Sequence, residues 1–117
     1  MSIIANGFER LNEGDFHGRL AAVHGIAVVL FSAPHCGSCR AWKRLLPDAL
    51  PGLTQALFDV DVSEATGVAR AFDIFHLPTV YLFRDGQFHA ELQCEARPDA
   101  IRQAVQSLLA APPQDEP

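Results

Sequence analysis

The chain has 117 residues, of which 49% are hydrophobic, and a formal net charge of −5 at pH 7. This length and apolar content fit one domain with a single core, which needs no disulfide scaffold to fold. Because no Lys- or Arg-rich run supplies counter-charge for phosphate groups, we expect no nucleic acid as a partner.

The first residues, MSIIANGFERLNEGDF, lack the basic stretch and apolar run of a secretory signal. The longest apolar run, residues 26–31, is too short to span a bilayer, so we expect no membrane contact. Three cysteines are an odd number and too few for a disulfide framework. We therefore expect a cytoplasmic protein, in which a C-x-x-C pair is catalytic or metal-binding rather than structural.

In the first half of the chain, strands and helices alternate. A short strand is expected at residues 8–11 and a helix at 13–23. The continuously apolar stretch 27–31 is typical of a strand buried on both faces, as in a parallel sheet. Residues 39–50 have apolar side chains at spacings of three and four, which predicts a helix that Pro47 kinks or ends.

The pattern LFDVDV at residues 57–62 predicts a strand whose aspartates, Asp59 and Asp61, point away from the neighbours on the Leu57 side or toward a solvated edge. A helix is expected at 64–72. Two strands, 79–83 and 87–94, are expected to form an antiparallel hairpin because Asp85-Gly86 is a strong turn signal.

A last helix is expected at 98–109, with Pro98 in its first turn. The order βαβαβαββα predicts an α/β fold: a mixed parallel and antiparallel sheet flanked by helices on both faces. We expect residues 1–110 to form this single domain, and residues 111–117 to be a disordered tail.

Cys36 and Cys39 stand between the buried strand and the helix that follows it. Unpaired N–H groups and the positive end of the helix dipole stabilise a thiolate there, and the thiolate is the form that attacks a disulfide. Cys39 returns to the same side one turn later. The pair can be a redox dithiol, part of a zinc site or two packed structural thiols, and its position after a buried strand favours the redox dithiol.

From residue 8 to residue 109 the chain resembles the thioredoxin family. The features that agree in order are VVLF before CGSC, Asp61 at the end of the next strand, FDI then LPT, and RDG at the hairpin. The resemblance implies a thioredoxin fold, with Cys36 as nucleophile and Cys39 as resolving thiol. It also implies that Pro78 follows a cis peptide bond, faces the cysteines and positions a substrate strand.

The sequence also departs from the family pattern. Ser32 and His35 stand where tryptophan is common, and Ser38 replaces a common proline. Leu30 occupies the place of a buried aspartate thought to take the proton from the resolving thiol, and Leu57 that of its lysine neighbour. We therefore expect a drier site without an internal base.

Several further residues are candidates for the substrate groove. They are His35, Gly37, Ser38, His76, Leu77, Pro78 and Cys94. His35 either stabilises a Cys36 thiolate or only shapes the surface, and His76 is either a groove residue or a plain loop histidine. Cys94 is a small core-facing thiol, a third redox-active thiol or a site of regulatory modification. The other histidines, His17, His24 and His89, are expected to be solvated.

The predicted function is disulfide exchange with protein substrates, in the direction of reduction with electrons from a partner reductase, by a monomer that needs no cofactor. The alternative is a binding or chaperone-like module that uses the same groove with little turnover.

Overall fold

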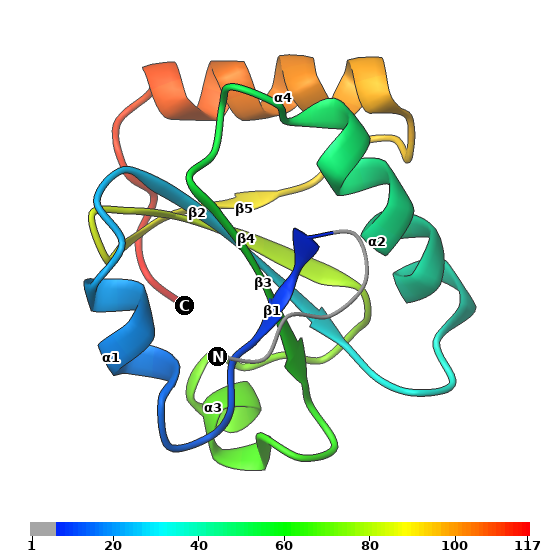
Figure 1. Cartoon of the computed structure of the whole chain (residues 1–117), viewed down its shortest axis with the longest axis vertical. Helices are drawn as coiled ribbons and strands as arrows, with labels where there is room; N and C mark the ends of the chain where they lie inside the picture. The colour runs from blue at the N-terminus through cyan, green and yellow to red at the C-terminus, as the bar shows by residue number, and fades with distance from the viewer. Residues whose placement is uncertain (1–6) are drawn as a thin grey trace.

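The computed structural model describes residues 7–117, so the first six residues of the predicted domain lie outside the described part. Five strands form one sheet in the order β1-β3-β2-β4-β5 (Figure 1). The strands are β1 (Glu9–Arg10), β2 (Ile26–Ser32), β3 (Ala56–Asp61), β4 (Thr79–Arg84) and β5 (Gln87–Leu92). The helices are α1 (Phe16–Ala21), α2 (Gly37–Ala49), α3 (Thr66–Ala71) and α4 (Pro98–Ala110). Strands β1, β3 and β2 are parallel, whereas β4 and β5 are antiparallel additions, which confirms the mixed sheet.

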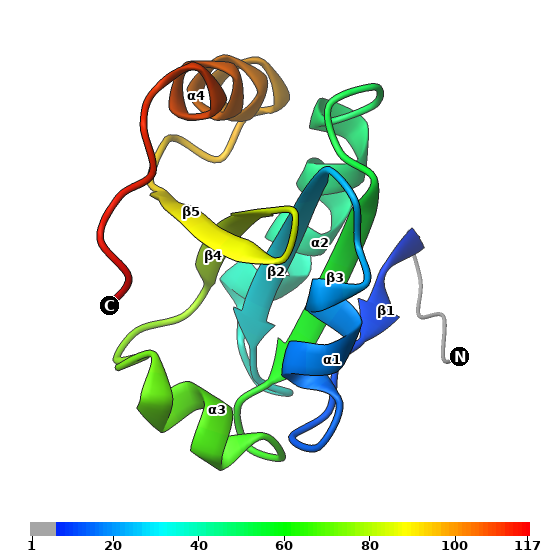
Figure 2. The same ribbon diagram turned by 90° about the vertical axis from the view of Figure 1, so that its left-hand side faces the viewer.

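Helices cover both faces of the sheet (Figures 1 and 2). Residues of α1 and α3 pack on one face and residues of α2 and α4 on the other. Strand β2 lies in the middle of the sheet, and all seven of its residues are buried. This agrees with the expectation from its continuous apolar run.

The face under α1 and α3 has an aromatic core. Its ring pairs include Phe31 with Tyr81 at 5.2 Å and Phe16 with Phe72 at 5.5 Å between centroids. Tyr81 donates its hydroxyl hydrogen to the Phe72 carbonyl oxygen at 3.3 Å. Burial, with smaller effects of the Glu91 and Asp73 carboxylates, raises the pKa of Tyr81 to about 12.

Helix α2 continues through Pro47 to Ala49, so of the two effects predicted for this proline, a kink or an end, the end was wrong. Leu46, Ala49 and Leu50 are at most 2% exposed. Burying a leucine side chain contributes roughly 1.5–3 kcal/mol, and two such residues offset the roughly 3 kcal/mol cost of an interior proline. The helix closes just before Pro51, as expected. Helices α1 and α3 are each shorter than predicted, at six residues.

Strand β5 contains an irregularity that the alternation of its sequence did not reveal. The register shifts between Leu82 and Phe83, so that Leu82 pairs with Ala90 while Phe83 pairs with Phe88. Phe88 therefore packs on the aromatic face and Ala90 on the opposite face, although the regular alternation of a strand would place both on one face. His89, at the bulge, is 2% exposed and its Nε2 lies 2.7 Å from the Leu108 carbonyl oxygen, so its predicted solvated position was wrong.

The segment after α4 runs beside β5. The backbone N–H of Gln114 donates to the His89 carbonyl oxygen at 2.7 Å, and the Gln114 side-chain oxygen accepts from the Glu91 N–H at 3.1 Å. Disorder of residues 111–117 was expected, and these two contacts were not foreseen.

Candidate active site

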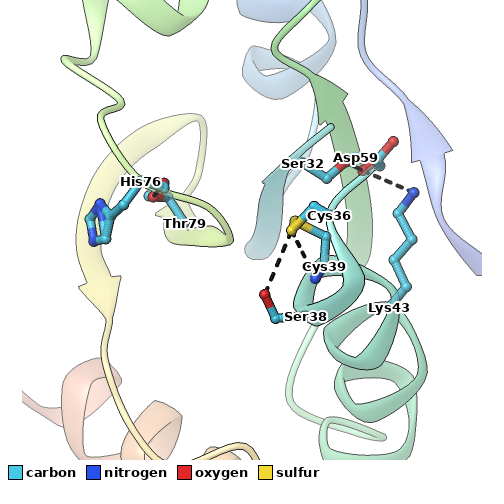
Figure 3. Close-up of a disulfide and its surroundings, with 8 residues drawn as sticks. All are labelled: Ser32, Cys36, Ser38, Cys39, Lys43, Asp59, His76 and Thr79. Carbon is cyan, nitrogen blue, oxygen red and sulfur yellow. Dashed lines mark hydrogen bonds and ion pairs between the residues drawn. A yellow bond between two sulfur atoms is a disulfide. The ribbon is translucent and has the colours of Figure 1, made fainter. Parts of the chain in front are cut away.

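Cys36 and Cys39 form a disulfide at the N-terminus of α2, where the chain leaves the end of β2 (Figure 3). The S–S distance is 2.14 Å. The two sulfurs differ in access, because Cys36 is half-buried whereas Cys39 is only 1% exposed. An incoming thiol or disulfide can thus reach Cys36 before Cys39.

Cys36 is the N-cap residue of α2. Its Sγ accepts a hydrogen bond from the backbone N–H of Cys39 at 3.1 Å, and the Ser38 hydroxyl lies 3.6 Å away. Both groups, together with the helix dipole, stabilise negative charge on this sulfur once the disulfide is reduced. The local structure therefore favours Cys36 as the thiolate of the pair.

The Leu77-Pro78 peptide bond is cis, which confirms what the family resemblance implied. Thr79 pairs with Phe31 across the β2–β4 ladder, so Pro78 lies beside the end of β2, from which the cysteine loop departs. The Thr79 hydroxyl donates to the His76 carbonyl oxygen at 2.7 Å and so closes the turn before β4. The register thus places Pro78 on the cysteine side of the sheet.

The other candidate groove residues lie around this point. His35, Gly37 and Ser38 are exposed in the cysteine loop. His76 is also exposed, and its ring is turned away from the disulfide (Figure 3). The roles of these four residues in substrate binding stay predictions.

Cys94 follows the end of β5, is half-buried and packs against the aliphatic core under α2 and α4. Burial, with a smaller effect of the Glu95 carboxylate, raises the pKa of its thiol. Both features agree with the core-facing alternative for this residue. A redox role for Cys94 stays a prediction.

A buried carboxylate lies near the disulfide, so the site is less dry than we expected, while the expected lack of an internal base stays a prediction. Asp59 is 0% exposed, and its Oδ1 accepts a hydrogen bond from the Ser32 hydroxyl at 2.7 Å (Figure 3). Arg10 Nε lies 2.8 Å from Asp59 Oδ2, and Lys43 Nζ lies 3.5 Å from Oδ1. The predicted position of Asp59 at a solvated edge was therefore wrong.

The pairing register explains why Asp59 is buried. Asp59 is opposite Leu30 in the parallel β2–β3 ladder and opposite Arg10 in the β1–β3 ladder. Leu30 contributes to the core under α2, and neighbours in a parallel ladder point to the same face. Helix α2 covers Asp59 on this face and supplies Lys43. The one sequence signal was a charged residue between apolar neighbours, at a position with the same parity as Leu57.

Within residues 7–117, no group of three or more His, Cys, Asp or Glu side chains is arranged to hold a metal ion. No helix in this described part of the chain has the length and apolar character required to cross a membrane.

The thioredoxin family model matches residues 7–107. The chain belongs to the thioredoxin family. Within this family, it is 29% identical over 100 residues to thioredoxin of Gallus gallus, which covers 84% of this chain and 94% of that protein. It is also 34% identical over 83 residues to protein disulfide isomerase-like 1-3 of Arabidopsis thaliana, which covers 67% of this chain but only 14% of that protein.

Among solved structures, the human ERp44 zinc-bound form superposes with a TM-score of 0.72 at 20% identity, covering 86% of this chain and 31% of that chain. This likeness supports the thioredoxin fold alone. The thioredoxin and isomerase relatives favour disulfide exchange over the alternative of a binding or chaperone-like module.

Proposed function

We propose that this thioredoxin-family chain is a thiol-disulfide oxidoreductase that reduces protein disulfides through the Cys36/Cys39 dithiol. The observation that carries the proposal is the asymmetry of the pair: Cys36 is half-buried and caps α2, whereas Cys39 is buried behind it. A nucleophile needs access and a stabilised thiolate, while a resolving thiol needs only to reach its neighbour.

In the proposed reaction, the Cys36 thiolate attacks one sulfur of a substrate disulfide and forms a mixed disulfide, and the other substrate sulfur leaves as a thiolate. Cys39 then attacks Cys36 Sγ, so that the Cys36–Cys39 bond forms and the second substrate sulfur leaves. Two electrons pass from the dithiol to the substrate, and no cofactor is required.

Pro78 is proposed to position the substrate. The cis turn at Leu77-Pro78 is beside the end of β2, and an extended substrate segment can pair with backbone groups there in the manner of an added strand. The loop residues Gly37 and Ser38, both exposed, leave the approach to Cys36 open.

The protein is proposed to act in the cytoplasm as a monomer and to receive electrons from a partner reductase. The unpaired thiol of Cys94 is compatible with a reducing compartment, in which free thiols persist. Among the described residues, Phe75 is the one large hydrophobic side chain that is exposed, at 88%. A single exposed ring is not the continuous apolar patch of a stable subunit interface.

The test is insulin reduction with dithiothreitol as electron donor, comparing the wild type with Cys36→Ser and Cys39→Ser. The wild type should accelerate precipitation of the insulin B chain, Cys36→Ser should not exceed the dithiothreitol background, and Cys39→Ser should accumulate a mixed disulfide. A wild-type rate equal to that of Cys36→Ser would instead support a binding module.

The direction of electron flow is tested by equilibrating the pair with glutathione buffers. A reduction potential of about −270 mV agrees with a reductant, whereas one above roughly −180 mV indicates an oxidant or isomerase. Light scattering coupled to size-exclusion chromatography checks the monomer.

A further inference from the structure

Phe75 exposes a ring that contributes nothing to the core. Among residues 7–117 it is the one large hydrophobic side chain that is exposed, at 88%. Contact of an apolar surface with water is unfavourable, and burial in a partner relieves it. Single exposed apolar side chains are common on protein surfaces, so exposure alone assigns no role. Two further observations, the place of Phe75 beside the cysteine loop and a hollow next to its ring, point to one.

The backbone on both sides of Phe75 holds its ring outside the core. Asp73, just after α3, has a φ of 52°, and the N–H groups of Asp73 and Ile74 donate to carbonyl oxygens in the last turn of this helix at 3.1 and 3.0 Å. These bonds are those of a Schellman motif. Ile74 and Leu77 pack against the aromatic core on either side of Phe75. Because its neighbours are fixed, Phe75 loses little conformational freedom when it binds a partner.

The ring also lies at the end of the sheet where the cysteines are. Phe75 is three residues before Pro78, which lies beside the end of β2 because Thr79 pairs with Phe31. Figures 1 and 2 show the segment between α3 and β4 at the same end of the sheet as the loop between β2 and α2. Three residues span at most about 10 Å. An extended segment that pairs at Pro78 can therefore bring a residue about two to four positions away to Phe75.

A hollow of about 230 Å³ adjoins the ring, and it is lined by Ala69, Arg70, Asp73, Ile74 and Phe75. Its two charged residues, Arg70 and Asp73, are exposed, have opposite signs and form no ion pair within the described part of the chain. An apolar centre with a polar rim is typical of a recognition surface. The volume is below the roughly 300–1,000 Å³ of pockets for drug-sized ligands, so the hollow suits a single side chain.

A transient contact with a substrate fits this surface better than a second copy of the chain. An aromatic side chain buries about 150–250 Å², whereas a stable interface buries roughly 1,200–2,000 Å². The cysteine loop, residues 32–38, contains no large apolar side chain, and the single tryptophan, Trp42, packs against the aliphatic core. Phe75 is therefore the exposed ring that a substrate segment at Pro78 can reach.

We propose that Phe75 selects substrates: its ring and the adjoining hollow bind an apolar side chain located about two to four residues from the substrate cysteine that bonds to Cys36. This inference rests on the proposed oxidoreductase function and names its substrate class, a protein disulfide flanked by an apolar residue. Backbone pairing at Pro78 does not depend on the substrate sequence, whereas the hollow accepts one side chain. Phe75 takes no part in the bond changes. It holds a favoured substrate sulfur near Cys36 and so speeds the attack.

The experiment measures this selectivity with peptides whose single cysteine is linked by a disulfide to 2-nitro-5-thiobenzoate. The reduced full chain, in a Cys94→Ser background, attacks the peptide sulfur through Cys36. The Cys36–peptide disulfide forms, and the coloured thiolate leaves with the electron pair of the broken bond. Stopped-flow absorbance gives the second-order rate constant. Six peptides carry one leucine two, three or four residues before or after the cysteine, and a seventh has serine at all of these positions.

The wild type should react with at least one leucine peptide at least about fivefold faster than with the serine peptide, because the leucine buries apolar surface. In Phe75→Ser this ratio should fall below about twofold, and Phe75→Leu, which keeps an apolar side chain, should retain most of it. The matched control is Gln103→Ala, at an exposed position of α4, and it should keep the wild-type ratio. A purely structural effect of Phe75→Ser would slow all peptides alike and leave the ratio unchanged.

Equal rate constants for the leucine and serine peptides in the wild type would overturn the inference, as would a leucine preference that persists in Phe75→Ser. A wild-type dimer that Phe75→Ser converts to a monomer, as measured by light scattering, would overturn it in favour of a second copy as the occupant. Failure of the proposed function looks different, because the wild type would then release the coloured thiolate no faster than Cys36→Ser and would not reduce insulin.

Discussion

The cores on the two faces of the sheet differ in residue composition. Under α1 and α3 lie the rings of Phe16, Phe31, Phe72, Tyr81 and Phe83. Under α2 and α4 the core is mainly aliphatic, and at the end that adjoins the disulfide it contains Asp59 and Ser32. Both polar side chains are at most 3% exposed.

This difference indicates that one face mainly stabilises the fold, whereas the other holds the polar groups next to the cysteines. The aromatic face buries large rings whose polar group, the Tyr81 hydroxyl, has a backbone partner. The opposite face accepts a charged residue where β2 and β3 end, next to the cysteines, although buried charges need partners and add little net stability. We therefore expect substitutions on the aromatic face to affect unfolding most, and those around Asp59 to affect disulfide exchange more than folding.

The largest expected effect on stability is that of Phe72→Ala. The Phe72 ring contacts those of Phe16, Phe31, Tyr81 and Phe83 and is 5% exposed. Removing it should lower the free energy of unfolding by about 3–5 kcal/mol, as measured by urea denaturation of the oxidised protein. Phe75→Ala, at the exposed ring three residues on, is the matched control and should change the value by less than about 0.5 kcal/mol. Equal losses in the two variants would show that burial in the aromatic core is not the source of the effect.

Asp59→Asn should lower the free energy of unfolding by a smaller amount, about 1–3 kcal/mol. The substitution leaves Arg10 and Lys43 without their shared carboxylate, but their side chains are 26% and 28% exposed, so water compensates part of the charge. Urea denaturation of the oxidised form measures the loss. The control is Asp48→Asn, at an exposed position of the same helix as Lys43. A loss as large as that in Phe72→Ala would mean that Asp59 is a main stabilising element.

The ionisation of the Tyr81 phenol shows whether water reaches the aromatic core. It is the only tyrosine of the chain, so ultraviolet absorbance against pH follows its ionisation alone. The midpoint should lie near its raised pKa of about 12, whereas the urea-unfolded chain should titrate near pH 10. Because the folded protein keeps the phenol neutral, this contribution to stability is complete below about pH 10 and is lost as the pH rises through about 12. A native midpoint near 10 would show that water reaches the ring.

The smallest effect concerns Cys94. While Cys36 and Cys39 form their disulfide, Cys94 is the free thiol of a chain with three cysteines, so iodoacetamide labels it alone. Its raised pKa lowers the thiolate fraction at neutral pH, and alkylation should be slower than in the urea-unfolded protein, with the difference narrowing at alkaline pH. Mass spectrometry measures the label, and Cys94→Ser serves as the blank. Labelling at the unfolded rate would support the redox alternative.

The sequence predicted the sheet and the position of the cysteines because both depend on local patterns. The apolar run of β2, the helical spacing after Cys39 and the Asp85-Gly86 turn each define an element without reference to distant residues. The cis bond before Pro78 came from the family resemblance alone, since few X-Pro bonds are cis.

The missed features depend on contacts between elements. Asp59 is buried because Arg10, Ser32 and Lys43 approach it from β1, β2 and α2, and no local pattern brings these residues together. The buried position of His89 depends on a bulge, which changes the face of every residue before it in the strand.

The contacts of Gln114 with β5 have a practical consequence for handling the protein. Strand β5 is at the margin of the sheet, where unpaired backbone groups can recruit a strand from another molecule. Gln114 engages the His89 carbonyl and the Glu91 N–H on this margin and blocks such pairing. Trimming residues 111–117, or attaching a tag that pulls them away, should therefore promote self-association at high concentration.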